Sequence, residues 1–191
     1  NTRAQRKLHY LIILKKQCFI VYLMPLKKKE MKLENITLTD ATTGLGGFAF
    51  MMMYKVGKLN LVELDKTKME NIKKNIQIYK KYTDVNCDIK FYNNNYLDIY
   101  EELKQDVIIF DPPWFGKSYK EKKNIRLFLE KDGKKYYMED IIVKLYKKNL
   151  FKILLFLIPF NFNINKFKSK LTKNKINFTL YKNIITIYHN D

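Results

Sequence analysis

From residue 36 onward, apolar runs of strand length alternate along the chain with segments in which apolar residues recur every three or four positions. The runs of strand length are 36–40, 59–63, 86–92, 106–110 and 151–158. The segments with helical spacing are 46–54, 66–82 and 137–149. A chain that alternates strands with helices folds into a mostly parallel sheet with helices on its faces. We therefore predict an α/β fold.

The last part of the chain departs from this alternation. Residues 176–188 contain two apolar runs on either side of Lys182 and Asn183, which predicts an antiparallel hairpin at the C-terminal end of a mostly parallel central sheet. Residues 165–174 predict a short basic helix. Residues 117–135 are polar and charged and contain Gly133, so we expect a loop with a short helix there.

A chain of 191 residues fits one domain. No internal repeat and no linker rich in Pro, Gly and Ser interrupts it. We expect a basic N-terminal extension over residues 1–35 and a single domain over residues 36–191. The sequence begins with Asn1 and not with Met, which leaves room for an upstream segment.

Basic residues gather in the two flanks of the chain. Residues 1–35 hold nine basic and two acidic residues, residues 36–116 hold ten and eleven, and residues 117–191 hold eighteen and six. Clustered Lys and Arg most often attract phosphate groups, so this layout predicts a centre that binds a small ligand between flanks that face a polyanion. A general compositional excess of lysine explains the same charge without any binding site.

The chain has two cysteines, Cys18 and Cys87, and neither has a second cysteine or a histidine at metal-ligand spacing. The sequence therefore predicts no disulfide framework and no metal site. The stretch from Leu8 to Met24 is the strongest candidate for a membrane segment, but Lys15 and Lys16 divide it into runs too short to cross a bilayer. We expect an intracellular protein, in the cytoplasm or nucleus, that does not enter a membrane.

A glycine-rich loop follows the first predicted strand. The loop runs from Asp40 to Gly47 and opens a helix, where glycines let a ligand approach the backbone amides. Glu63 ends the next strand, nineteen residues after Gly44, where its carboxylate can accept both hydroxyls of a ribose. This pairing favours a nucleoside ligand over a plain turn with a solvated strand end. A nicotinamide dinucleotide stays open as a rival, because Gly44, Gly46 and Ala49 also satisfy the relaxed dinucleotide fingerprint.

The tetrapeptide Asp-Pro-Pro-Trp at 111–114 follows the fourth predicted strand and lies at the edge where open α/β sheets bind ligands. Methylation of an exocyclic amine on a purine needs acceptors for the amine hydrogens and a surface that holds the base flat. Asp111 and the carbonyl of Pro112 supply two acceptors, and Trp114 supplies a face for stacking. This motif favours amine methylation, since a nicotinamide enzyme has no need of it.

With these motifs the chain resembles the class I S-adenosylmethionine-dependent methyltransferases, and among them the RNA cap guanine-N2 methyltransferases. This is the trimethylguanosine synthase family, with its relatives in large DNA viruses. Its members also carry Gly-Gly and then Tyr after the tetrapeptide, and a later strand that ends in Pro-x-Asn. This chain has Phe-Gly-Lys-Ser-Tyr at 115–119 and Pro-Phe-Asn at 159–161. The resemblance spans about residues 36–188 and implies a Rossmann-like methyltransferase fold.

The resemblance also implies roles for individual residues. The cofactor would be S-adenosylmethionine, with S-adenosylhomocysteine as the product and no metal. Its contacts would be Asp40, Thr43, Gly44, Gly46, Glu63 and Asn95. The catalytic residues at the target amine would be Asp111, Pro112 and Trp114. Trp114 would stack on the cationic 7-methylguanine through cation–π attraction. Further substrate contacts would come from Lys117, Tyr119 and Asn161.

Four positions differ from the usual pattern of these relatives. They carry Gly-Asp where Asn94 and Asn95 stand, and that Asp reads the adenine amine of the cofactor. Asn95 can still accept a hydrogen bond through its amide oxygen. Phe115 replaces the first glycine after the tryptophan, and Phe48 stands where a polar residue is common.

The sequence therefore predicts methyl transfer from S-adenosylmethionine to the exocyclic N2 amine of a 7-methylguanosine RNA cap. The partners would be capped RNA and, through the basic flanks, other proteins, in a cell or a virus-infected host. One alternative is an N6-adenine methyltransferase of DNA or RNA, because those enzymes share the tetrapeptide. A second alternative is a catalytically inactive subunit of the same fold that binds RNA or serves as a scaffold.

Overall fold

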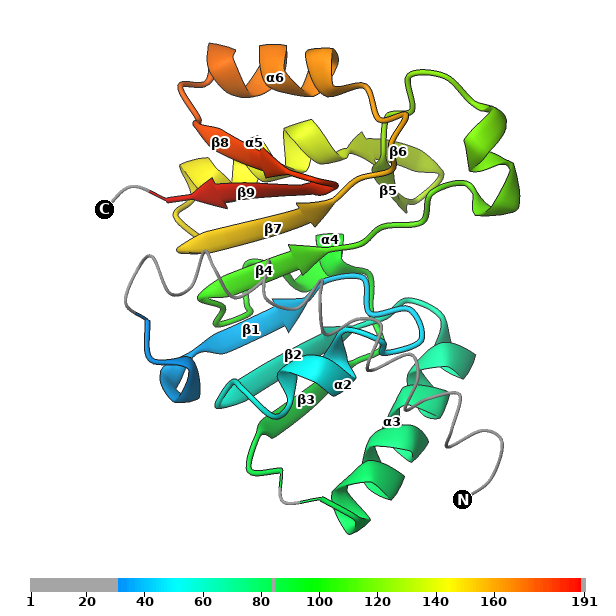
Figure 1. The fold of residues 1–191 in the computed structure, drawn as a ribbon, viewed down its shortest axis with the longest axis vertical. Coiled ribbons are helices and arrows are strands. Elements are labelled where there is room, and N and C mark those ends of the chain that lie inside the picture. The colour runs from blue at the N-terminus through cyan, green and yellow to red at the C-terminus, as the bar shows by residue number, and fades with distance from the viewer. Residues whose placement is uncertain (1–30, 84, 190–191) are drawn as a thin grey trace.

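Seven strands form one sheet in the computed structural model, which describes residues 31–83 and 85–189 (Figure 1). The strands are β1 (Thr37–Asp40), β2 (Lys58–Val62), β3 (Asp88–Tyr92), β4 (Val107–Phe110), β7 (Ile153–Leu157), β8 (Phe178–Tyr181) and β9 (Ile184–Tyr188). They lie in the order β3-β2-β1-β4-β7-β9-β8. The first five are parallel, whereas β9 is antiparallel to β7 and β8 is antiparallel to β9. The predicted α/β fold and its C-terminal antiparallel hairpin are confirmed.

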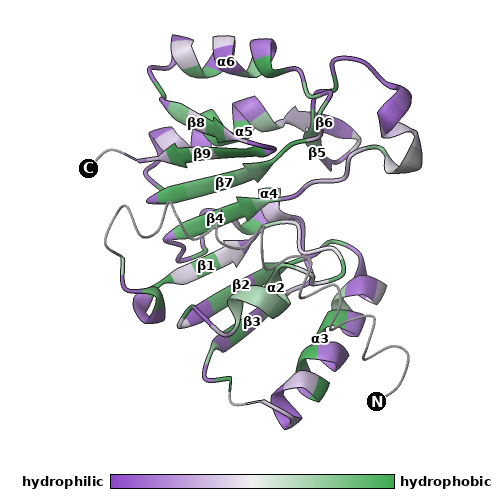
Figure 2. Cartoon of the chain, viewed as in Figure 1, coloured by the Kyte–Doolittle hydropathy of each residue, from purple (hydrophilic) through white to green (hydrophobic). Residues whose placement is uncertain are grey.

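Helices cover the sheet on both faces. The helices are α2 (Ala49–Met52), α3 (Lys66–Lys81), α4 (Tyr96–Ile99), α5 (Met138–Lys147) and α6 (Ile164–Lys173). Alternate residues of β4 divide between two hydrophobic clusters: Ile108 and Phe110 pack with α4, α5 and α6, and Val107 and Ile109 pack with α2 and α3. Because both faces of β4 and β7 are buried, both strands are apolar along their whole length (Figure 2).

Helix α3 shows how the local sequence sets an element. The Asp65 side chain accepts a hydrogen bond from the backbone N–H of Lys68 at 3.0 Å and caps the first turn. Met69, Ile72 and Ile76 form its buried stripe, with lysines on the exposed side. The spacing of apolar residues predicted that the helix extends to Tyr82 and buries it. The helix instead ends at Lys81, and Tyr82 is 78% exposed.

The structure of residues 117–135 agrees only in part with the loop and short helix that their polarity predicted. A short 3-10 helix, η2 (Gly116–Glu121), is present as expected, but two strands follow where a loop was predicted. Strands β5 (Phe128–Lys131) and β6 (Lys134–Tyr137) pair as an antiparallel hairpin. Asp132 and Gly133 turn the chain with φ of 51° and 70°. This Asp-Gly pair is the usual signal for a two-residue hairpin turn, and the surrounding charge obscured it.

The carboxyl ends of β1, β2, β3 and β4 lie along one edge of the sheet because these strands are parallel. The glycine loop, Glu63, Asn95 and Asp111 follow these strand ends, so the topology gathers them at that edge. A further 3-10 helix, η1 (Leu33–Asn35), precedes β1. Cys87 is buried in the core beneath α3. The predicted basic extension apart from residues 31–35, the stretch from Leu8 to Met24, and Cys18 lie outside the described residues.

Within residues 31–83 and 85–189, no helix is both long enough and apolar enough to span a membrane.

Candidate active site

The glycine loop is held in place by backbone and side-chain hydrogen bonds to the neighbouring strands. The Ala41 N–H donates to the Ile109 carbonyl at 2.9 Å and the Thr43 N–H donates to the Val62 carbonyl at 3.0 Å. Gly44 has a φ of 59°, a left-handed conformation that suits glycine. Its N–H donates to Oε2 of Glu63 at 2.8 Å. The loop and the acid predicted to act with it are therefore in direct contact.

Glu63 uses both carboxylate oxygens within this turn. Its Oε1 accepts from the backbone N–H of Asp65 at 2.9 Å, while Oε2 accepts from Gly44. Each carboxylate oxygen has two lone pairs, so each can accept a further hydrogen bond from a ligand. Glu63 also lines a cavity at this edge of the sheet.

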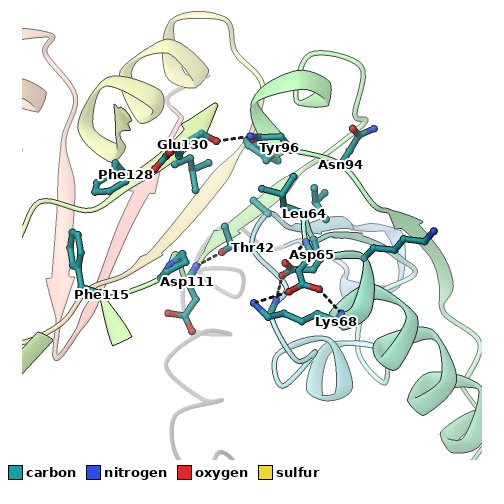
Figure 3. A pocket seen from close by; sticks show the side chains of 18 residues that line it. Thr42, Leu64, Asp65, Lys68, Asn94, Tyr96, Asp111, Phe115, Phe128 and Glu130 are labelled. Atoms are coloured by element: carbon teal, nitrogen blue, oxygen red, sulfur yellow. Dashed lines mark hydrogen bonds and ion pairs between the residues drawn. The ribbon is translucent and has the colours of Figure 1, made fainter. Parts of the chain in front are cut away.

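The loop after β4 is tied to the glycine loop. The Asp111 backbone N–H donates to Oγ1 of Thr42 at 2.9 Å, and this bond joins two segments 69 residues apart in the sequence. Figure 3 shows this contact at the centre of the site. Asp111 is exposed, whereas the following Pro112 is buried.

A cavity of about 790 Å³ lies between these elements. Its walls include Gly44, Glu63, Asn95, Asp111 and Pro113 from the four strand ends, and Phe128, Leu129 and Glu130 from β5. Ligand cavities in proteins are commonly about 300–1,000 Å³, so this one is large enough for a nucleoside and a base together. The glycine loop and the Asp-Pro-Pro-Trp turn therefore open into one shared cavity. Phe115 forms part of its wall without closing it, and Phe48 does not line it but packs, partly buried, against the hydrophobic cluster that contains α2.

The predicted site residues divide into two groups. Gly44, Glu63, Asn95 and Asp111 line the cavity. The others, which are outside its lining, are Asp40, Thr43, Gly46, Pro112, Trp114, Tyr119 and Asn161. The side chain of Lys117 lies outside what the structure describes, so its predicted substrate contact remains a prediction.

Several residues of the second group support the loops around the cavity. Thr43 donates through Oγ1 to the carbonyl of Asp40 at 3.1 Å, and both residues are buried. A side chain at Gly46 would come within 3.2 Å of Phe50 and 3.4 Å of Ile72, so this glycine allows α2 and α3 to pack closely. Their predicted cofactor contacts remain predictions.

Trp114 does not line the cavity and is half buried against both hydrophobic clusters. Its indole Nε1 is buried and has no hydrogen-bond partner among the described residues. The Tyr119 ring meets it edge to face at 5.6 Å between centroids. Asn161 donates through Nδ2 to the carbonyls of Tyr119 and Lys122, both at 2.6 Å. These contacts anchor the η2 segment to the core, and the substrate contacts predicted for these residues remain predictions.

Asn95 connects the cavity to the β5–β6 hairpin. Its Oδ1 accepts from the Leu97 N–H at 3.1 Å and caps α4, and its Nδ2 donates to the Glu130 carbonyl at 2.7 Å. An ion pair between Lys131 and Asp98 adds a second link between the hairpin and α4. Both polar atoms of the Asn95 amide therefore have protein partners.

A family model described as RNA cap guanine-N2 methyltransferase matches residues 35–189. The chain belongs to this family. It is also 32% identical over 155 residues to uncharacterized protein L320 of Acanthamoeba polyphaga mimivirus. That match covers 80% of this chain and 57% of the viral protein, so the chain spans little more than half of its relative's length.

Solved methyltransferase structures share the fold at low sequence identity. Magnesium protoporphyrin IX methyltransferase from Synechocystis, solved with bound S-adenosylmethionine, matches with a TM-score of 0.59 and 12% identity, over 96% of this chain and 84% of that one. A Pyrococcus furiosus methyltransferase has a TM-score of 0.55 and 16% identity, over 91% and 82% of the two chains. Ribosomal protein L11 methylase from Lactobacillus delbrueckii has a TM-score of 0.51 and 15% identity, over 86% and 74%. The Rossmann-like fold of class I methyltransferases is confirmed.

The residues at the cavity fit the cofactor of this family. Gly44 lines the cavity in a left-handed backbone conformation, with no side chain to hinder a ligand. Glu63 offers carboxylate oxygens for a ribose, and these strand ends are where α/β sheets bind nucleotides. This family of methyltransferases uses S-adenosylmethionine, and Gly44 and Glu63 would hold it here. Among the described residues, no group of three or more His, Cys, Asp or Glu side chains is placed to hold a metal ion.

Sequence reasoning missed the residues that close the cavity from the hairpin side. Phe128, Leu129 and Glu130 come from β5, which was predicted as loop. Tyr96 at the start of α4 was also missed, because that helix is only four residues long. Burial raises the pKa of Tyr96 above its usual range, so its hydroxyl stays protonated. The Asp-Gly turn at 132–133 was the signal that could have revealed the hairpin.

Proposed function

We propose that this methyltransferase transfers the methyl group of S-adenosylmethionine to the exocyclic N2 amine of a 7-methylguanosine RNA cap. One observation carries the proposal: Gly44 and Glu63 share a cavity with Asp111 and Pro113. The first pair provides the chemistry for a nucleoside cofactor, and the second pair belongs to the tetrapeptide suited to an aromatic amine. The family match supports the choice of the guanine N2 amine.

In this proposal Asp111 acts on the amine. A purine amine is a weak nucleophile because its lone pair is delocalised into the ring. A carboxylate that accepts a hydrogen bond from the amine N–H stabilises the positive charge that develops on nitrogen as it reacts. The bond from the Asp111 backbone to Thr42 holds this residue beside the glycine loop. When bound, S-adenosylmethionine would supply the electrophilic methyl group.

The direct test is methyl transfer by the purified chain from labelled S-adenosylmethionine to matched RNAs. We expect label in a 7-methylguanosine-capped RNA, at N2 by mass spectrometry, and none in the same RNA without the cap. Label confined to adenine in RNA or DNA would reject the cap assignment and select the N6-adenine alternative.

Asp111→Asn probes the chemistry of the site. We expect kcat to fall about 100-fold, as for other preorganised groups that stabilise developing charge. The dissociation constant for S-adenosylhomocysteine should stay unchanged in calorimetry, because Glu63 and Gly44 are intact. Asp132→Asn is the matched control, since Asp132 is exposed in the hairpin turn and does not line the cavity. Equal turnover in the two variants would remove Asp111 from the mechanism.

The second candidate is a subunit of this fold without turnover. It is favoured by Asn95, whose amide already has partners in Leu97 and Glu130, and by Trp114, which does not line the cavity. Calorimetry with S-adenosylmethionine separates the two candidates. A folded protein that fails to bind the cofactor would support the scaffold and contradict the proposed enzyme.

A further inference from the structure

Phe115 has an apolar side chain in a backbone conformation that favours glycine. Its φ of 67° and ψ of 26° are left-handed, and the next residue, Gly116, has a φ of 66°. A bulky residue is strained there, and strain of this kind is concentrated at functional sites. Burial in the core does not offset the strain, because Phe115 is 37% exposed and lines the cavity.

A second aromatic ring from a distant element meets Phe115 at the same wall. Phe128 of β5 also lines the cavity, and the two ring centroids are 5.6 Å apart with an angle of 63° between the ring planes. In Figure 3 the two rings lie on the opposite side of Asp111 from Leu64 and Asp65. We name Phe115 and Phe128 the aromatic corner. Asp111 therefore lies between the aromatic corner and the turn at residues 63–65.

Few other aromatic rings are available to a base in this cavity. Trp114 does not line it, and Tyr96, which does, is 2% exposed and packs edge to face against Phe110. Within the part of the chain that the structure describes, Phe115 and Phe128 are the remaining aromatic residues of the lining. Every nucleobase presents a π-face that can stack on such rings.

Two lysines accompany the aromatic corner. The Lys122 ammonium lies 5.6 Å from the Phe115 ring centroid, and the Lys135 ammonium lies 4.8 Å from the Phe128 ring centroid. Both lysines are exposed at the surface beside the cavity. Flat rings flanked by cations suit a ligand that combines a purine with phosphates.

We propose that Phe115 and Phe128 form the surface on which the purine of the substrate stacks, with Lys122 and Lys135 beside its phosphates. This inference rests on the proposed function, because it assigns the substrate end of the same cavity. Stacking on this corner would hold the base flat beside Asp111. Phe115 then acts in recognition of the substrate.

The test measures equilibrium binding and turnover separately in Phe115→Gly and Phe128→Leu. Glycine adopts the backbone of residue 115 without strain, so this variant keeps the fold while it loses the ring. We expect the dissociation constant for 7-methylguanosine triphosphate and the KM for capped RNA to rise about tenfold in both variants. The dissociation constant for S-adenosylhomocysteine should change less than about twofold, since Glu63 and Gly44 are untouched. Tyr181→Leu, an exposed aromatic residue of β8, is the control that should change neither constant.

The outcomes separate this inference from the proposed function. Cap affinity and KM unchanged in both variants would overturn the aromatic corner, and so would a loss of S-adenosylhomocysteine affinity with cap affinity retained. If the wild type binds 7-methylguanosine triphosphate through Phe115 but methylates no cap, the proposed function fails and the aromatic corner stands. A wild type that does not bind this nucleotide would overturn the aromatic corner.

Discussion

At the residue scale, Glu63 combines a structural and a binding role. Its two carboxylate oxygens accept hydrogen bonds from the backbone N–H groups of Gly44 and Asp65, and the residue lines the cavity. A carboxylate accepts hydrogen bonds only, so it matches both these N–H groups and the hydroxyls of a ribose. The Glu63 carboxylate thus stabilises the glycine loop and is also the group that would bind the ribose of the cofactor.

Glu63→Gln should therefore weaken cofactor binding more than it weakens the fold. The amide keeps one acceptor oxygen but places an NH₂ group against one backbone N–H, and the charge is lost. Hydrogen bonds to charged groups contribute about 1.5–3 kcal/mol, so we expect the dissociation constant for S-adenosylhomocysteine to rise roughly 10- to 100-fold. Calorimetry measures this change. Glu70→Gln is the control, because Glu70 lies on α3 outside the cavity and pairs with Lys73. Equal affinities in the two variants would contradict the role of Glu63.

At the element scale, the β5–β6 hairpin determines the shape of the cavity. It carries Phe128 and Glu130 into the cavity wall and is held by contacts on two sides. On the α4 side, Asn95 donates to the Glu130 carbonyl. On the α5 side, Arg126 donates through Nε and Nη2 to Oε1 of Glu139 at 2.8 and 2.5 Å. The Arg126 guanidinium also lies 3.5 Å from the centroid of the Tyr137 ring.

Two substitutions at Asn95 separate its roles. Asn95→Asp keeps the acceptor that caps α4 but cannot donate to Glu130, whereas Asn95→Ala loses both bonds. We expect faster hydrogen exchange across residues 128–131 in both variants. We expect a loss of about 1 kcal/mol in the free energy of unfolding from the missing cap in the alanine variant alone. Unchanged exchange in Asn95→Asp would show that the Glu130 bond does not hold the hairpin.

The Arg126–Glu139 pair should stabilise the hairpin only while both partners are present. The Glu139 side chain is 3% exposed, so Arg126→Met leaves a buried carboxylate without its cation. Breaking such a pair costs about 3–5 kcal/mol, whereas replacing both partners with apolar residues is often close to neutral. We expect urea unfolding to show a smaller loss for the double variant Arg126→Met/Glu139→Met than for Arg126→Met alone. A larger loss in the double variant would be inconsistent with an uncompensated charge in the single one.

At the scale of the whole molecule, the charge is distributed around a nearly neutral centre. Residues 36–116, which supply most of the cavity, hold ten basic and eleven acidic residues, while the net charge of the chain is +18. The segment that follows the tetrapeptide is basic and adjoins the cavity through Phe115. We propose that this segment contacts the phosphates of the RNA beyond the cap.

Replacing Lys117, Lys120 and Lys123 with alanine should weaken binding of capped RNA and reduce its dependence on salt. Each phosphate contact to a single strand contributes about 0.7 to the slope of log affinity against log salt, so the slope should fall by about 2. The control replaces Lys166, Lys168 and Lys173 of α6, which removes the same charge from an exposed helix face. Filter binding at several salt concentrations measures both slopes. Equal slopes would assign the effect to net charge alone.

Local patterns in the sequence predicted most of the sheet and the first part of the site. Strands β4 and β7 are apolar along their whole length because both of their faces are buried. Helix α3 has a single apolar stripe because only one of its faces is buried. Helix α4 and the β5–β6 hairpin were missed because they are short and lack a continuous apolar run of the kind that revealed β4. Helix α4 has four residues, and each strand of the β5–β6 hairpin has four. Their stability comes from contacts such as Asn95 with Glu130, which join residues 35 apart.

The sequence by itself determined the α/β alternation, the place of the glycine loop and the order of Glu63 and Asp111 after their strands. These features depend on the spacing of apolar side chains and on the backbone freedom of glycine, and both are properties of a few neighbouring residues. Only the tertiary structure decided which aromatic rings face the cavity. Trp114 turns toward the core, and Phe115 meets Phe128 from β5. That choice depends on packing between segments distant in the sequence, and no local pattern encodes it.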